Sequence, residues 1–225
     1  MIFIKKLVFN PVQVNTYMVY DDTKECVIID PGMSNISENQ KFAAMVEKLK
    51  LKPVKVLLTH AHFDHVLGCT FVSDRYELLP EGCSDDEFIL KNTKEYAAQF
   101  GFALNEAPPL LDNYFAQGDK VCFGNSTLEV IHVPGHSPGS LLYYHPESGI
   151  LLSGDVLFAG SIGRSDLVGG NHKQLIDGIY DKLLTLPDTV KVYPGHGAET
   201  TILNEKSYNP FLRREVKKVI VQDEK

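Results

Sequence analysis

Thr59-His60-Ala61-His62-Phe63-Asp64-His65 follows an apolar run at residues 54–58 and places four potential metal ligands within one turn of the chain. Side chains two residues apart share one face of an extended segment, whereas on a helix they point to nearly opposite sides. His60 and His62 can therefore face one ion only where a strand ends and a loop begins. Asp64 and His65 come round the turn, and the apolar stretch 66–72 suggests a helix leaving the site, so one turn can serve two adjacent ions.

A single histidine is usually a packed or solvated side chain. Three histidines and an aspartate in one turn are a different case, because so many titratable groups are costly to bury without a cation that neutralises and organises them. The spacing therefore favours a metal site over a structural cluster.

Three further turns repeat this pattern of an apolar run followed by ligand-type residues, at Pro134-Gly135-His136, Gly154-Asp155 and Pro194-Gly195-His196. Their glycines let the backbone bend sharply and hold the next side chain outward. Open α/β sheets gather their sites at the carboxyl ends of strands. We therefore expect four strand ends to meet in one cleft.

The candidate ligands are imidazoles and carboxylates without a thiolate: His60, His62, Asp64, His65, His136, Asp155 and His196. This set suits two zinc ions above all, with iron or manganese as alternatives. Because a carboxylate can bridge two ions, we place Asp155 between them. The expected ligands of the first ion are His60, His62 and His136, and those of the second are Asp64, His65 and His196.

Composition narrows the remaining function classes. The 225 residues carry a formal net charge of -7, and Lys and Arg are scattered rather than massed, which argues against a nucleic-acid surface. The first residues lack the order of a signal peptide, and no apolar run approaches the roughly 20 residues of a membrane span, so we expect a cytoplasmic protein with no membrane partner. The cysteines (Cys26, Cys69, Cys83 and Cys122) form no C-x-x-C pair, which predicts reduced thiols. Nothing in the sequence indicates an oligomeric state.

Strand and helix patterns alternate without a linker, which predicts one α/β (α+β) domain over residues 1–225. We expect strands at residues 7–9, 16–20, 26–29, 54–58, 121–123, 127–133, 141–144, 150–152 and 190–193. Helices are expected at 34–50, 66–72, 85–100 and 173–184 and from 209 onward, and 107–111 is expected to be a loop. The first three strands read as an antiparallel meander, and the order of elements suggests two similar halves.

The turn motifs together resemble the metallo-β-lactamase superfamily, and within it the glyoxalase II (hydroxyacylglutathione hydrolase) branch. The matching stretches occur in the family's order: Thr59-His60-Ala61-His62-Phe63-Asp64-His65, Pro134-Gly135-His136-Ser137-Pro138-Gly139-Ser140, Ser153-Gly154-Asp155-Val156-Leu157-Phe158 and Pro194-Gly195-His196-Gly197. Asn209-Pro210-Phe211-Leu212-Arg213 near the end also resembles that branch. The resemblance implies a four-layer αββα sandwich with its site along one edge, and it supports the ligand assignment.

The activity that follows is metal-assisted hydrolysis of a small-molecule acyl thioester such as S-lactoylglutathione. Two ions bring the pKa of a shared water towards about 7, and the hydroxide attacks the thioester carbonyl. Asp64 is expected to position the attacking oxygen as well as to bind the second ion, and Asp155 to bridge. Arg164 is our candidate for holding a substrate carboxylate, because its planar guanidinium suits that geometry, although a salt bridge within its own loop is an equal alternative.

Two features set the chain apart from long glyoxalase II enzymes. Only residues 197–225 follow the last candidate ligand, so we expect the helical segment that binds glutathione carboxylates to be shortened or absent. The stretch Ser161-Ile162-Gly163-Arg164-Ser165-Asp166-Leu167-Val168-Gly169-Gly170 resembles the short-form relatives instead.

Alternative functions remain open at this point. A persulfide dioxygenase resembles this fold but uses one iron, and a lactonase or β-lactamase is a further possibility. A metal-binding regulatory module without turnover is disfavoured by the complete ligand set. Among the remaining histidines, His132 is expected to pack within its strand, with the orientation of a metal ligand as the alternative, and His145 and His172 are expected to lie in solvent.

Overall fold

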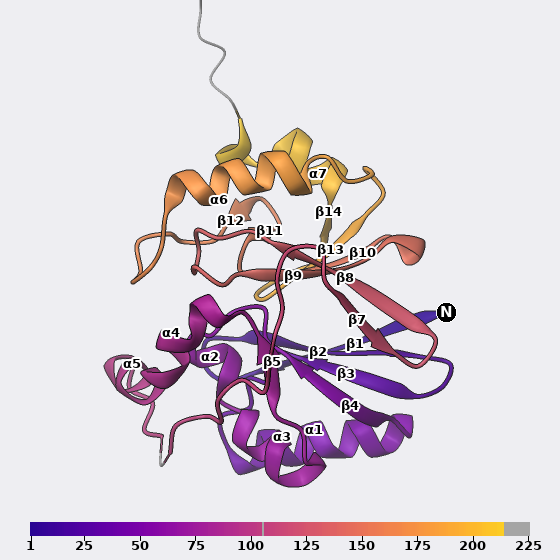
Figure 1. Cartoon of the computed structure of the whole chain (residues 1–225), viewed down its shortest axis with the longest axis vertical. Helices are drawn as coiled ribbons and strands as arrows, with labels where there is room; N and C mark the ends of the chain where they lie inside the picture. The colour runs from indigo at the N-terminus through magenta and orange to yellow at the C-terminus, as the bar shows by residue number, and fades with distance from the viewer. Residues whose placement is uncertain (105, 214–225) are drawn as a thin grey trace, which may run out of the picture.

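Two six-stranded sheets form the centre of the computed structural model, which describes residues 1–104 and 106–213 (Figure 1). The first sheet has the order β1-β2-β3-β4-β5-β6. Its strands are β1 (Ile2–Phe9), β2 (Val14–Asp21), β3 (Glu25–Ile29), β4 (Lys52–Leu57), β5 (Pro80–Gly82) and β6 (Asn113–Tyr114). The first three pair antiparallel, which confirms the predicted meander, and β3 to β6 run parallel.

The second sheet has the order β14-β13-β10-β9-β8-β7. It comprises β7 (Lys120–Phe123), β8 (Ser126–His132), β9 (Leu141–His145), β10 (Ile150–Gly154), β13 (Lys191–Pro194) and β14 (Thr200–Thr201). The strands β11 (Leu157–Phe158) and β12 (Ser161–Ile162) form a separate small hairpin. Sequence patterns missed β5, β6, β11, β12 and β14, because two or three residues are too few to show a period.

Helices cover the outer faces of both sheets. Figure 1 shows α1 (Ile36–Leu49) and α3 (Cys69–Tyr76) below the first sheet, and α6 (His172–Gly178) and α7 (Ile202–Tyr208) above the second. The shorter helices α2 (Phe63–Val66), α4 (Glu87–Lys91) and α5 (Thr93–Gln99) lie beside the sheet edge, and the single turns are η1 (Ser84–Asp86), η2 (Pro146–Ser148), η3 (Ile179–Leu183) and η4 (Pro210–Leu212). The layers are those of an αββα sandwich, which confirms the predicted fold class.

The strands read as continuous apolar runs because both of their faces are buried. In β3, Val27 and Ile29 pack between the two sheets, whereas Ile28 packs on the opposite face with residues of α1. In β9, Tyr143 faces the inter-sheet core and Tyr144 faces the helices above. Each sheet therefore separates two apolar layers, and the inter-sheet core fixes the distance between the strand ends.

Three helix predictions need correction. The helix predicted at 85–100 is divided at Asn92, whose side-chain amide donates to the Phe88 carbonyl and competes with the helical pattern. The stretch 66–72 spans the end of α2 and part of α3, with Gly68 at the N-cap of α3. The helix at 173–184 widens into a π-turn after Gly178.

The helix expected from residue 209 onward is also wrong within the described residues. Helix α7 ends at Tyr208, and only a 3-10 turn follows at residues 210–212. Pro210 explains the break, because it has no N–H to continue the helix. Residues 214–225 lie outside the described part of the chain.

Two simpler expectations concern cysteines and membrane spans. All four cysteines lie in the described part of the chain and are free, and Cys122 is the exposed one. None of the helices in residues 1–104 and 106–213 combines the length and apolar character that crossing a membrane requires.

A buried hydroxyl links the inter-sheet core to the strand end that precedes Thr59. Tyr143 is fully buried, and its hydroxyl donates to the Leu58 carbonyl at 2.8 Å. Tyr143→Phe leaves that carbonyl without a partner, so we expect the free energy of unfolding to fall by about 1–3 kcal/mol. Urea denaturation measures it. Tyr208→Phe, at a residue that is 71% exposed, is the control and should change stability by less than about 0.5 kcal/mol; equal effects of the two substitutions would contradict the prediction.

Candidate metal centre

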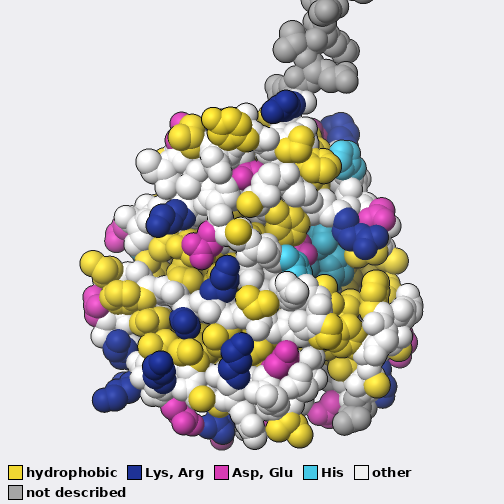
Figure 2. Space-filling view, turned by 180° about the vertical axis from the view of Figure 1, so that it is seen from behind, with side chains coloured by type: hydrophobic (Ala, Val, Ile, Leu, Met, Phe, Trp, Pro, Cys, Tyr) yellow, Lys and Arg dark blue, Asp and Glu magenta, His cyan; other side chains and the backbone are white. Residues whose placement is uncertain are grey.

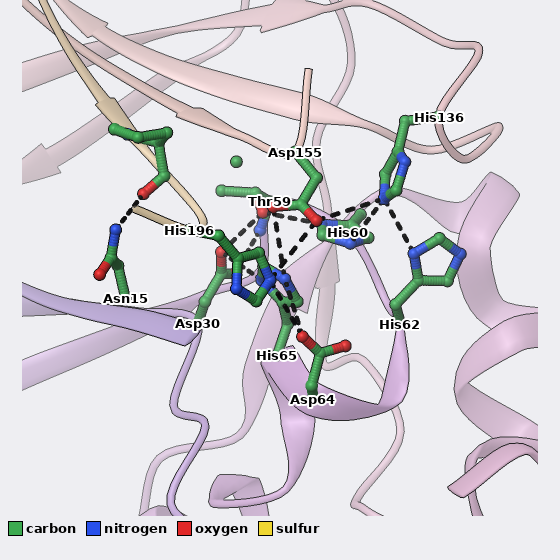
Figure 3. Close-up of polar contacts among 12 residues, drawn as sticks. Asn15, Asp30, Thr59, His60, His62, Asp64, His65, His136, Asp155 and His196 are labelled. Atoms are coloured by element: carbon green, nitrogen blue, oxygen red, sulfur yellow. Dashed lines mark hydrogen bonds and ion pairs between the residues drawn. The ribbon is translucent and has the colours of Figure 1, made fainter. Parts of the chain in front are cut away.

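Four strand ends converge on one cleft between the two sheets. The chain leaves β4 just before His60, β8 shortly before His136, β10 just before Asp155 and β13 just before His196. Figure 3 shows these side chains and their neighbours pointing towards one another. The structure thus brings together all seven predicted ligands, and their binding of metal stays a prediction.

The first group of three is made of imidazoles alone. The Nε2 atom of His136 lies 2.9 Å from His62 Nδ1 and 3.1 Å from His60 Nε2. Four ligands around a zinc ion at about 2.0–2.1 Å are separated by about 3.3 Å in a tetrahedral arrangement. Ring nitrogens of His60, His62 and His136 therefore converge at nearly the spacing of zinc ligands, and all of them lie within 4.8 Å of one another.

The second group of three combines one carboxylate with two imidazoles. The Oδ2 atom of Asp64 lies 3.1 Å from His196 Nε2 and 3.5 Å from His65 Nε2. Asp155 lies between the two groups, with Oδ1 at 3.5 Å from His65 Nε2, and with Oδ2 at 3.7 Å from His136 Nε2 and 3.6 Å from His196 Nε2. This position suits a bridging carboxylate.

The remaining ring nitrogen of three of these histidines is fixed by a backbone or carboxylate oxygen. His136 Nδ1 donates to the Arg164 carbonyl at 2.8 Å, His65 Nδ1 to Asp30 at 2.9 Å and His196 Nδ1 to the Gln13 carbonyl at 3.2 Å. A nitrogen that donates such a bond leaves the lone pair on the opposite nitrogen. In each case that opposite nitrogen, Nε2, faces the cleft.

The first strands of the chain also hold the turn of His196. Val14 forms an isolated antiparallel bridge with His196, and the Asn15 N–H donates to the Gly195 carbonyl at 2.7 Å. The Tyr17 hydroxyl and the Asn15 amide both donate to the Pro194 carbonyl. Strand β2 therefore positions a ligand that lies about 180 residues later in the sequence.

Two atoms of the cluster indicate that divalent ions fit. His65 Nε2 and Asp155 Oδ1 are buried and have no hydrogen-bond partner among the described residues. Buried polar atoms without a partner are costly, and atoms of this kind that face each other at 3.5 Å are suited to a shared cation. Nitrogen and oxygen donors without thiolate match zinc and also iron or manganese.

The pKa values of the first group favour neutral imidazoles. Burial lowers the pKa of His60 well below its ordinary value, and the rings of His65 and His136 act in the same direction. Burial and then His136 lower the pKa of His62 to about 3. Neutral imidazole is the form that binds metal, because its lone pair is free.

The second group contains charges of both signs. Burial by itself would lower the pKa of His65. The neighbouring carboxylates of Asp64, Asp155 and Asp30 outweigh burial, so the pKa of His65 lies well above its ordinary value. Burial by itself would raise the pKa of Asp155. The ring of His65 outweighs burial, so the pKa of Asp155 falls below its usual range. A cation that binds here takes the place of protons, since metal binding requires deprotonated ligands.

Asp30 is a site residue that the sequence prediction missed. Its carboxylate accepts from the Thr59 N–H at 2.7 Å and the Thr59 hydroxyl at 2.6 Å, and it orients His65. A signal existed, because Asp30-Pro31-Gly32 follows the apolar strand β3 just as the ligand turns follow theirs.

Asp86 is a second residue that the prediction missed, and it connects two ligand turns. Its Oδ2 atom accepts from the Ala61 N–H at 3.0 Å and the Ser137 hydroxyl at 2.8 Å, and its Oδ1 atom accepts from the Gly139 N–H at 2.6 Å. Asp86 is 2% exposed. The surrounding Ser84-Asp85-Asp86 is a polar run without a preceding apolar strand of detectable length, so the sequence offered no signal.

The other candidate residues lie in different settings. Arg164 lines the cleft, and its Nε and Nη2 atoms donate to Asp166 at 2.8 Å, which is the salt bridge that was the alternative to substrate binding.

The expectation that His145 is solvated is wrong, because it is 6% exposed and accepts from the Ser148 N–H within the turn that Pro146 begins. His132 bonds the Pro138 carbonyl, and His172 is exposed as expected.

Comparison with known proteins agrees with the fold and the turn motifs. The sequence pattern of the Metallo-beta-lactamase superfamily matches residues 9–196. Hydroxyacylglutathione hydrolase GloC of Haemophilus influenzae is 37% identical over 202 residues, which cover 89% of this chain and 93% of that protein. The crystal structure of the BLEG-1 B3 metallo-beta-lactamase superposes with a TM-score of 0.85 at 35% identity, over 94% of this chain and 100% of that one. The crystal structure of TTHA1623 in a di-iron-bound form superposes with a TM-score of 0.83 at 37% identity, over 92% of this chain and 100% of that one.

Gly195 leaves room for the carboxylate of Asp155. A Cβ atom at Gly195 would lie 2.1 Å from Asp155 Oδ1 and 2.8 Å from His65 Cε1. We expect Gly195→Ala to displace Asp155 and to lower the affinity for the second ion at least about tenfold, measured by chelator competition. In the control Gly82→Ala the new Cβ meets only ordinary contacts, at 3.5 Å or more. Equal metal affinities in the two variants would refute this role of Gly195.

Asp86→Asn tests the link between the two ligand turns. An amide keeps one acceptor but turns the other into a donor, which then faces the Ala61 N–H or the Gly139 N–H. We expect the affinity for the first ion to fall about 10–100-fold, as measured by competition with a chelator. Asp85→Asn, at the exposed neighbouring residue, is the matched control. An unchanged first-ion affinity in the Asp86 variant would show that its hydrogen bonds do not support the site.

Proposed function

The chain belongs to the metallo-beta-lactamase superfamily, and from that premise we propose that it is a binuclear metallohydrolase that cleaves small-molecule acyl thioesters. The observation that carries the proposal is the pair of ligand groups on either side of Asp155, with the free nitrogens of three histidines aimed inward and with two buried atoms that have no hydrogen-bond partner among the described residues. Similarity to a protein named a hydroxyacylglutathione hydrolase and to a di-iron-bound structure supports it.

Each residue of the site has a distinct proposed part. When bound, two divalent ions supply hydroxide at neutral pH and polarise the carbonyl oxygen of the substrate. Asp64, which lines the cleft with His196, accepts a hydrogen bond from the attacking oxygen and orients it. Asp155 holds the two groups at a fixed separation. The thiolate departs without a dedicated general acid, because a thiol with a pKa near 8.5 is already a good leaving group.

Arg164 is the proposed contact for a carboxylate on the substrate. Its side chain lines the same cleft as Asp64 and His196 and is exposed. Its ion pair with Asp166 occupies Nε and Nη2, so a carboxylate would have to compete with Asp166 or use the remaining edge of the guanidinium. Because Asp166 already occupies two of its nitrogens, Arg164 is proposed to add only a weak contribution to substrate affinity and none to the rate of the chemical step.

A second candidate is hydrolysis of a β-lactam, which the similarity to BLEG-1 favours, or of a lactone. The same hydroxide chemistry would act on an amide or ester carbonyl. A persulfide dioxygenase with one iron is less consistent with the geometry. A single iron in the first group would leave the second group, Asp64, His65 and His196, without an ion to share.

Asp155→Ala tests the bridging role. We expect this variant to lose bound metal and at least about a hundredfold in thioesterase activity together, because one carboxylate serves both ions. His172→Ala is the control, since His172 is exposed and is not among the residues that line the cleft. Metal analysis and turnover are measured on the same samples. Full turnover by the Asp155 variant would contradict the assignment.

The activity itself is decided by a substrate panel. Purified protein with about two ions per chain should cleave S-lactoylglutathione or another acyl thioester, with release of the thiol followed by a chromogenic reagent. One bound iron with oxygen consumption on glutathione persulfide would favour the dioxygenase. Faster cleavage of nitrocefin or a lactone than of any thioester would favour the second candidate.

A further inference from the structure

The metal centre opens into a cavity of about 360 Å³ whose far wall is apolar. His62, Asp64, His136, Asp155 and His196 line one end. The remaining wall is contributed mainly by Phe63, Ile89, Tyr96, Phe100, Leu167 and Val168, and Val12 with the polar Gln99, Arg164 and Asp166 completes it. Figure 2 shows histidine side chains in a hollow of the surface, with hydrophobic side chains directly beside them.

Aromatic packing builds one side of this wall. Phe63 lies next to Asp64 in α2 and is buried, and its ring stacks on that of Phe100 with centroids 5.0 Å apart. Phe102 packs against Phe63 at 5.2 Å. Phe100 is nevertheless 54% exposed, so the end of α5 presents an aromatic surface to the cavity. Val168, 56% exposed, adds apolar surface from the loop after β12.

The cavity offers little to a charged substrate arm. Among the described residues that line it, Arg164 is the only Lys or Arg, and its charge is paired with Asp166 by two hydrogen bonds of 2.8 Å. Glutathione carries two carboxylates and an ammonium group, and transferring such groups from water to an apolar wall without partners is unfavourable. An aryl or branched alkyl group gains free energy there by burying apolar surface.

We infer that this enzyme selects thioesters with an uncharged apolar arm, which lies against Phe100 and Val168 while the thioester carbonyl faces the metal centre. The inference rests on the proposed function and specifies its substrate class. The arm is either the acyl group or the thiol, and a matched set of substrates distinguishes these sources.

The experiment compares four thioesters on the metal-loaded enzyme. Phenylacetyl-N-acetylcysteamine carries the aryl group on the acyl side. S-benzyl thioacetate carries it on the thiol side, and acetyl-N-acetylcysteamine has no aryl group. Acetylglutathione has a charged thiol. We expect kcat/KM for at least one aryl substrate to exceed that for acetyl-N-acetylcysteamine about tenfold or more, mainly through KM, and acetylglutathione to show no such advantage.

Phe100→Ala assigns the preference to the aromatic wall. The ratio of kcat/KM between the better aryl substrate and acetyl-N-acetylcysteamine should fall about fivefold or more, with KM carrying the change. Phe211→Ala is the matched control, because Phe211 is 55% exposed but lies in η4 and does not line the cavity. This control should keep the wild-type ratio.

Two results would overturn the inference. One is acetylglutathione as the best substrate with that preference abolished in Arg164→Gln, which would assign the cavity to carboxylate recognition. The other is cleavage of all four thioesters at similar kcat/KM. If no thioester is cleaved, the proposed function fails instead. Calorimetry on the metal-loaded protein then tests whether the cavity binds an apolar group, and phenylacetate binding no tighter than acetate would refute an apolar subsite.

Discussion

The convergence of buried imidazoles and carboxylates at the ends of four strands is the constraint on which the structure depends. Such groups desolvate one another, and among the described residues His65 Nε2 and Asp155 Oδ1 have no hydrogen-bond partner, only ion-pair contacts of 3.5 Å. Burying these groups costs free energy that a bound cation would offset. The two-sheet core stabilises it by fixing the strand ends. Asp30 and Asp86 then hold the ligand turns through buried hydrogen bonds.

Much of this arrangement could be predicted from the sequence, because the features that determine it are local. Strands buried on both faces leave continuous apolar runs, and each ligand follows such a run through a turn. The same rule would have identified Asp30, which also follows a strand. Asp86 could not be found in this way, because its three partners, Ala61, Ser137 and Gly139, are distant from it in sequence.

Other differences arise where contacts across the fold override local pattern. His145 borders a proline turn, which suggested solvent, yet its ring is buried beside η2 and accepts a backbone N–H. The sequence of strand β5 contains no apolar run. Its extended conformation is stabilised by pairing with β4 and β6. The break at Asn92 depends on one side-chain hydrogen bond, which the helical period of residues 85–100 does not reveal.

The bridge between Val14 and His196, with the bonds from Asn15 and Tyr17 to the same turn, has a consequence for biosynthesis. A polypeptide emerging from the ribosome exposes His60 and His62 long before His136 and His196 have been synthesised. The early half therefore holds only a fragment of a chelating site, and the closing contacts join the beginning of the domain to its end. Assembly of the candidate site is thus coupled to completion of the fold, because an interrupted nascent chain lacks the candidate ligands of the later turns, His136, Asp155 and His196.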